Sequence, residues 1–217
     1  MISQQRVGVK VRMMDSKRRV LTFDEAKRLV DIADNLCDKT YIALGYVTGH
    51  RINEVLRLKK DDFRLYSGQE MLDTFVSDGD DRAIKDIVPD NYYLIIWMTA
   101  QKTRENINRT RHPLMFDVAG TPFMKYILEY LAKVNGGRLF HRSDRTYQRR
   151  INKWCKYAGV DAFVFHGFRH TRMNRFIIKD ASHFETMAWF GWKDLRAPQM
   201  YFKKSIGNVL RLMRKVK

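Results

Sequence analysis

The run Tyr92–Met98 (YYLIIWM) most limits what this chain can fold into. Aromatic and β-branched residues dominate it, which is typical of a β-strand. A weaker strand is predicted over 111–116, beyond the polar stretch 101–110, and a short one around 63–65. The two longer strands indicate an antiparallel hairpin with a long basic loop. Most of the remaining chain has apolar residues at helical spacing. We therefore predict a mainly α fold with a small three-stranded antiparallel sheet.

The helical pattern begins at Thr22, which is predicted to cap a helix with Glu25 three residues later, as in a capping box. Residues 1–21 are basic and have little apolar periodicity, so we interpret them as an N-terminal arm or linker. Residues 22–217 are then one domain. Helices are predicted at about 39–47, 51–58, 122–134, 144–158, 167–179, 183–190 and 203–217. Residues 67–91 carry seven acidic and two basic side chains, which indicates an acidic surface insertion.

The charge of the chain is concentrated in its second half. The 217 residues include 41 Lys and Arg against 24 Asp and Glu, a net charge of +17, and residues 101–217 carry 25 basic and 8 acidic side chains. This excess favours nucleic acid as a partner, although a solvated charged face would give the same count. No apolar run approaches the length of a membrane span, and no signal peptide is visible. Two distant cysteines suggest a reducing compartment, so we expect a cytoplasmic protein without a membrane partner.

Five separated features carry chemically suggestive residues. They are the segment Thr48–Leu56 (TGHRINEVL), Lys102 in the hairpin loop, the segment His166–Thr171 (HGFRHT), the tripeptide Phe190–Trp192 (FGW), and Tyr201 nine residues after Trp192. Each feature alone is a weak signal. Their order and spacing together form a specific pattern.

In this order and spacing the chain resembles the catalytic domain of the tyrosine recombinase family, which is also called the lambda-integrase-like or phage integrase family. The resemblance runs from about residue 20 to the end. The family pattern is an arginine in Thr-Gly-x-Arg-x-x-Glu, a hairpin lysine, His-x-x-Arg, a Leu-Gly-His-like tripeptide and a tyrosine. The departure is Trp192, which stands where histidine is usual, as it does in yeast-plasmid-type recombinases. The resemblance implies the DNA breaking-rejoining enzyme fold.

The chemistry of strand exchange suits these residue types. A tyrosine phenol that attacks phosphorus stores the phosphodiester energy in an ester that a sugar hydroxyl can later reverse. Two arginine forks can hold the charge that develops on the nonbridging oxygens. A lysine or histidine can give the leaving deoxyribose oxygen its proton.

The resemblance assigns a role to each matched position. It implies Tyr201 as nucleophile, Arg51 and Arg169 as a phosphate clamp, Lys102 as general acid, and His166 as proton acceptor or phosphate hydrogen-bond donor. Trp192 is expected to pack beside the site, and Glu54 to orient a basic group. Further DNA contacts are predicted for Arg104, Arg109, Arg111 and Lys193.

Several alternatives remain open from the sequence. His166 could only cap its helix, Lys102 could only contact phosphate, and Arg172 or His170 could replace Arg169 in the clamp. No metal ligand set or Gly-rich phosphate loop is visible, so neither a metal nor ATP nor another cofactor is expected. The resemblance implies double-stranded DNA as partner, with a homotetramer on a DNA synapse and a monomer without DNA.

The predicted function is that of a site-specific recombinase or integrase acting through a 3′-phosphotyrosyl intermediate, for example in viral genome integration. The protein would then act in the host cytoplasm or nucleoid. The competing hypotheses are a type IB topoisomerase, a hairpin-forming protelomerase and a DNA-binding protein without catalysis. Members of the family usually carry an N-terminal domain that clamps the other side of the duplex, whereas only about 20 residues precede the pattern here.

Overall fold

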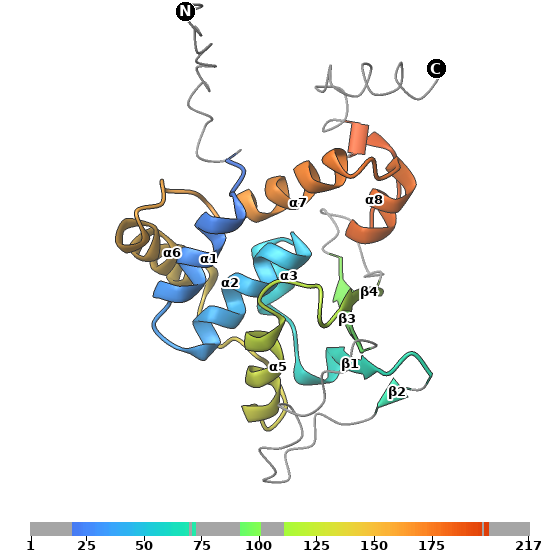
Figure 1. Cartoon of the computed structure of the whole chain (residues 1–217), viewed down its shortest axis with the longest axis horizontal. Helices are drawn as coiled ribbons and strands as arrows, with labels where there is room; N and C mark the ends of the chain where they lie inside the picture. The colour runs from blue at the N-terminus through green and yellow to red at the C-terminus, as the bar shows by residue number, and fades with distance from the viewer. Residues whose placement is uncertain (1–18, 70, 73–91, 101–110, 197, 200–217) are drawn as a thin grey trace, which may run out of the picture.

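A computed structural model of the chain describes residues 19–69, 71–72, 92–100, 111–196 and 198–199. Helices dominate these ranges, and the strands gather on one side of the molecule below α8 (Figure 1). The elements are α1 (Phe23–Ile32), α2 (Leu36–Thr48), α3 (Ile52–Leu56), the short 3₁₀ helix η2 (Lys60–Asp62), β1 (Phe63–Tyr66), β2 (Met71–Leu72), β3 (Tyr93–Thr99), β4 (Arg111–Asp117), α5 (Met124–Lys133), α6 (Asp144–Ala158), α7 (His166–Ile178) and α8 (His183–Phe190).

Helix α2 is the centre of the helical part. It contacts α1, α5, α7 and α3, and every residue from Thr40 to Thr48 is buried. Asn35 caps its start, because the side chain accepts from the backbone N–H of Asp38 at 3.0 Å. Gly49 ends it in the left-handed region with φ of 65°. Helix α2 therefore ends at Gly49, and residues 50–54 follow directly after it.

The sheet has the strand order β2-β1-β3-β4, and all its neighbours are antiparallel. Strand β3 pairs with β4 over its whole length, from Tyr93 opposite Asp117 to Thr99 opposite Arg111. Side chains of β4 alternate between exposed and buried, as expected for a sheet that covers a core on one face. The mainly α fold with a small antiparallel sheet is thus confirmed. The two-residue strand β2 adds a short edge within the stretch that we interpreted as an acidic insertion.

The predicted start of α1 is confirmed by its hydrogen bonds. The backbone N–H of Glu25 donates to Thr22 Oγ1 at 3.2 Å, and the Glu25 carboxylate accepts from the N–H of Thr22 at 2.9 Å. The chain before this cap crosses α7, where the N–H of Leu21 donates to Thr171 Oγ1 at 2.9 Å. Among the described helices, none is long and apolar enough to cross a membrane. Residues 1–18 of the predicted arm 1–21, most of the insertion and the predicted C-terminal helix 203–217 lie outside the described residues.

Candidate active site

A buried carboxylate joins the two arginines of the predicted clamp. Arg51 precedes α3, and the Glu54 carboxylate reaches back to accept from the Arg51 N–H at 2.7 Å and from Arg51 Nη1 at 3.2 Å. Oε2 of Glu54, the oxygen that accepts from the Arg51 N–H, also lies 3.9 Å from Nη1 of Arg169 on α7. Glu54 is only 4% exposed, so its charge requires cationic neighbours. The structure therefore brings together three of the predicted residues, Arg51, Glu54 and Arg169.

Arg169 is the most enclosed charged side chain of this cluster, with 1% of its surface exposed. Its guanidinium lies 4.2 Å from the ring centre of Phe190 and 4.9 Å from that of Trp192. Such stacking favours the cation and fixes its plane. Trp192 also stacks on Phe190 with ring centres 4.9 Å apart. It therefore packs beside the arginine, where the sequence placed it.

Arg172 is the alternative clamp residue, and its surroundings differ. Its guanidinium lies 4.3 Å from the ring centre of Trp189 and 5.0 Å from that of Phe176. Burial lowers the pKa of Arg172 to about 10. Both arginines pack on aromatic rings, but of the two only Arg169 also has an ion pair with Glu54 in the described part of the chain. The geometry therefore favours Arg169 as the partner of Arg51.

His166 is exposed at the start of α7, close to the charged cluster. Its ring centre is 5.0 Å from that of His170. Partial burial lowers the pKa of His166 to about 4, and the positive charges of His170, Arg169 and Arg51 add to this effect. The imidazole is therefore neutral at pH 7, so one of its ring nitrogens is an acceptor.

This lowered pKa predicts a pH dependence of DNA binding. A phosphate beside His166 favours the imidazolium, so binding should raise the pKa above 4 and take up a proton as the pH falls towards about 5. We expect the affinity for duplex DNA to increase more steeply towards acid pH in the wild type than in His166→Gln. Fluorescence anisotropy at constant salt over about pH 5–8 measures both slopes. Identical slopes would remove His166 from the phosphate site.

A buried histidine pair, which the sequence analysis missed, lies beneath the cluster. His50 Nε2 is 3.2 Å from His112 Nε2, and His112 Nε2 is 3.0 Å from the carbonyl oxygen of Trp189. A carbonyl oxygen only accepts, so we assign the proton to His112 Nε2, and this single N–H is shared between two acceptors, the Trp189 carbonyl oxygen and His50 Nε2. His50 Nδ1 then donates to Thr48 O at 3.2 Å. Burial is the main cause that lowers the pKa of His50, and the positive charge of Arg169 lowers it further. The imidazole of His50 is therefore neutral.

The pair connects three segments that carry predicted site residues. His50 adjoins Arg51, and His112 lies on β4, directly after the hairpin loop. The third segment is the end of α8, where Trp189 Nε1 donates to Thr48 O at 2.8 Å. Gly191 follows with φ of 62°, and a Cβ added there would lie 2.7 Å from the His112 ring. The histidines therefore fix the Arg51 segment against β4 and α8.

The hydrogen bonds of His112 predict a measurable loss of stability. His112→Leu leaves the Trp189 carbonyl and His50 Nε2 without this donor, which should cost about 2 kcal/mol or more of unfolding free energy. The melting temperature should fall by about 4–8 °C. His112→Gln retains an N–H donor and should recover part of the loss, while Met115→Leu, at an exposed position of the same strand, should melt as the wild type does. Equal melting temperatures for the Leu and Gln variants would contradict the assigned hydrogen bonds.

The remaining predicted residues divide into two groups. Arg111 and Lys193 are exposed, and Arg111 Nη2 forms an ion pair with Asp62 Oδ1 at 2.6 Å. Lys102, Arg104, Arg109 and Tyr201 lie outside the described residues, so their roles stay predictions. No group of three or more His, Cys, Asp or Glu side chains in the described ranges is arranged to hold a metal ion.

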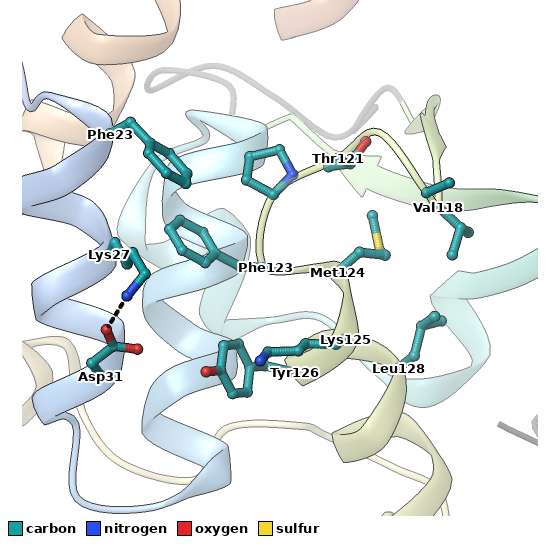
Figure 2. A pocket seen from close by; sticks show the side chains of 12 residues that line it. Phe23, Lys27, Asp31, Val118, Thr121, Phe123, Met124, Lys125, Tyr126 and Leu128 are labelled. Carbon is teal, nitrogen blue, oxygen red and sulfur yellow. Dashed lines mark hydrogen bonds and ion pairs between the residues drawn. The ribbon is translucent and has the colours of Figure 1, made fainter. Parts of the chain in front are cut away.

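A hollow of about 450 Å³ lies elsewhere, between α1 and the start of α5. Figure 2 shows Phe23 beside Phe123, and the Lys27–Asp31 ion pair on the α1 side. The two phenylalanine rings stack with centres 5.7 Å apart. None of the predicted site residues lines this hollow. It is therefore separate from the arginine cluster.

Solved structures of recombinases have a similar fold. The XerH site-specific recombinase bound to difH substrate, in a pre-cleavage complex, matches with a TM-score of 0.62 and 16% identity over 91% of this chain and 54% of that chain. Its post-cleavage complex with palindromic difH substrate matches at 0.59 and 16%, over 90% and 52%. The XerA recombinase matches at 0.58 and 18%, over 93% and 66%. The chain thus spans about half the length of the XerH chains.

No curated protein sequence matches this chain. The sequence pattern of the phage integrase family, in contrast, matches residues 19–206. This range contains each residue predicted to take part in catalysis, including those outside the described ranges. It also contains every described helix and strand. The chain therefore belongs to the phage integrase family, as its motifs predicted.

Proposed function

We propose that this protein is a site-specific DNA recombinase that cleaves and rejoins strands through a covalent 3′-phosphotyrosyl intermediate. The observation that carries the proposal is the arrangement of Arg51 and Arg169 around the buried Glu54 carboxylate. Arg51 has 43% of its side chain exposed and can receive a phosphate directly. A carboxylate that holds two guanidinium groups preorganises them for the charge of a transition state.

The proposed reaction balances without an external energy source. The phenolic oxygen of Tyr201 forms a bond to phosphorus, and the bond from phosphorus to the 5′ oxygen breaks. The neutral His166 accepts the phenol proton, Lys102 protonates the leaving 5′ oxygen, and the arginines hold the nonbridging oxygens. A 5′ hydroxyl then attacks the phosphotyrosyl ester and restores a phosphodiester. One ester replaces another at each step, so ATP is not required.

The proposal is tested by trapping the intermediate. Incubation with supercoiled and linear DNA, followed by denaturation, should yield a covalent protein–DNA adduct with a free 5′ hydroxyl that a polynucleotide kinase labels directly. An adduct on the 5′ end would reject the proposed chemistry. Absence of any adduct would favour a binding protein, and rapid relaxation of many plasmids per protein would favour a type IB topoisomerase.

Assembly is part of the same proposal. The protein would bind double-stranded DNA as a monomer in solution and form a homotetramer on paired sites. The sequence after Tyr201 supports this, because its apolar positions recur at helical spacing and require a covering surface. Such a recombinase would act in the cytoplasm, and in viral genome integration if its gene is viral. Sedimentation with and without a paired target duplex measures the change in mass.

A further inference from the structure

A second hollow, which is basic, is lined partly by the segment that directly follows α3, the helix of Glu54. It has a volume of about 560 Å³ and is lined by Arg57, Lys59, Asp62, Thr99, Arg111 and Arg138. Four of these six side chains are cationic, and all four are exposed. They come from three separate parts of the chain: the segment after α3, the beginning of β4, and the loop before α6. The fold therefore concentrates charge that is dispersed in the sequence.

The walls of this hollow are held by backbone hydrogen bonds. The N–H of Leu139 donates to Leu58 O at 3.0 Å, and the N–H of Lys60 donates to Gly137 O at 3.0 Å. These bonds flank an isolated antiparallel bridge between Lys59 and Arg138. The two side chains thus start from neighbouring backbone positions that are fixed with respect to each other. The backbone pairing therefore fixes the walls of the hollow, which does not arise from long side chains that happen to lie close together.

The charges that line this hollow favour the binding of an anion. Asp62 is the single acidic residue of the lining, and it is engaged by the Lys59 N–H at 2.9 Å and by Arg111 Nη2 at 2.6 Å. This carboxylate orients Arg111, whose guanidinium lies 5.5 Å from the ring centre of Trp97. In the described ranges, Arg57, Lys59 and Arg138 form no ion pair with a carboxylate. Like charges in one hollow repel each other, and a phosphate with several acceptor oxygens relieves that repulsion.

The position of the hollow suits the DNA strand that the active site would cut. Arg57 ends the short helix that Arg51 begins, and six residues at about 1.5 Å each separate them by roughly 9 Å. This separation is of the order of the spacing between neighbouring phosphates of one DNA strand, so Arg51 and the hollow can contact phosphates close together on that strand. Thr99 and Arg111 stand at the base of the hairpin whose loop contains Lys102. The hollow therefore lies between two segments that the proposed chemistry uses.

We propose that this hollow binds one backbone phosphate that flanks the scissile phosphate, held jointly by Arg57 and Arg138. This inference rests on the proposed function for the identity of the ligand, which is duplex DNA. Lys59 contributes charge, and Arg111, fixed by Asp62, closes the side next to the hairpin. The subsite would set the register of the strand before the clamp engages.

The test measures DNA binding without cleavage, in a Tyr201→Phe background. The affinity for a random duplex of about 25 bp is measured by fluorescence anisotropy over a salt series for Arg57→Gln, Arg138→Gln and the double variant. Each single variant should bind roughly tenfold more weakly at low salt, since each loses a hydrogen bond to a charged group. The log–log salt slope of the double variant should be smaller than the parent slope by about 0.9, the value for one phosphate. Lys125→Gln removes an exposed charge on α5, away from the hollow, and should leave the slope unchanged.

Two results would overturn the subsite. An unchanged slope in the double variant would show that no phosphate occupies the hollow. A decrease of about 1.8 would show that Arg57 and Arg138 hold separate phosphates. Both results are independent of adduct formation by the wild type. The two proposals can therefore fail separately. If the wild type forms no adduct but the salt slope of the double variant is smaller by about 0.9, the recombinase function is rejected and the DNA subsite is retained.

Discussion

Tyr201→Phe is expected to abolish covalent adduct formation, with a decrease of at least about ten-thousandfold in cleavage, because the nucleophilic oxygen is the only atom removed. The change leaves the charge of the protein unaltered, so DNA affinity should stay within about twofold. Adduct formation is measured on denaturing gels, and affinity by anisotropy on the same duplex.

A matched variant distinguishes the nucleophile from other tyrosines. Tyr157→Phe removes the same oxygen from a side chain that is 64% exposed at the end of α6, and it should cleave as the wild type does. An adduct that persists in Tyr201→Phe and disappears in another Tyr→Phe variant would assign the nucleophile elsewhere.

Arg169→Ala should lower the cleavage rate at saturating DNA by about a hundredfold or more, the scale for one donor to a developing oxyanion. It should also destabilise the fold, because the buried Glu54 carboxylate loses a cationic neighbour. Single-turnover cleavage and thermal melting separate the two effects.

The Arg169→Lys variant separates the effect on the cleavage rate from the effect on stability more clearly. Lysine retains the charge beside Glu54, so most of the thermal stability should return. It lacks the planar fork that holds two phosphate oxygens, so the cleavage rate should remain low. Full recovery of cleavage by lysine would show that charge alone is required and would contradict a bidentate clamp.

Local signals in the sequence were sufficient for most of the fold. The Thr22–Glu25 capping box, the helical periodicity and the strand run Tyr92–Met98 each depend on residues a few positions apart. The structure has the capping box at Thr22 and a strand at Tyr93–Thr99, one residue further along than predicted. The short strand β2 was missed because two residues within an acidic stretch carry no periodic pattern. Glu54 was expected only to orient a basic group, and in the structure it contacts Arg51, three residues earlier in the chain.

Long-range features of the site could not be derived in the same way. Arg169 lies near Glu54 only through the packing of α7. The family resemblance, and no local spacing, implied that Arg51 and Arg169 act together, and the contact of Arg169 with Glu54 was not predicted. Its near-complete burial was not foreseen, because arginines are rarely enclosed. The His50–His112 pair joins residues that are 62 positions apart. Neither histidine stands in a pattern that distinguishes it from a surface residue.

The histidine pair also has a consequence for how this sequence can change over time. Positions 50, 112 and 191 form a coupled unit, since His112 requires the acceptor on His50 and fills the space that any side chain at Gly191 would need. A substitution at one position is therefore tolerated or rejected according to the residues at the other two. Relatives that have lost the histidines should differ at all three positions together, so that substitutions accumulate there in concert and not singly.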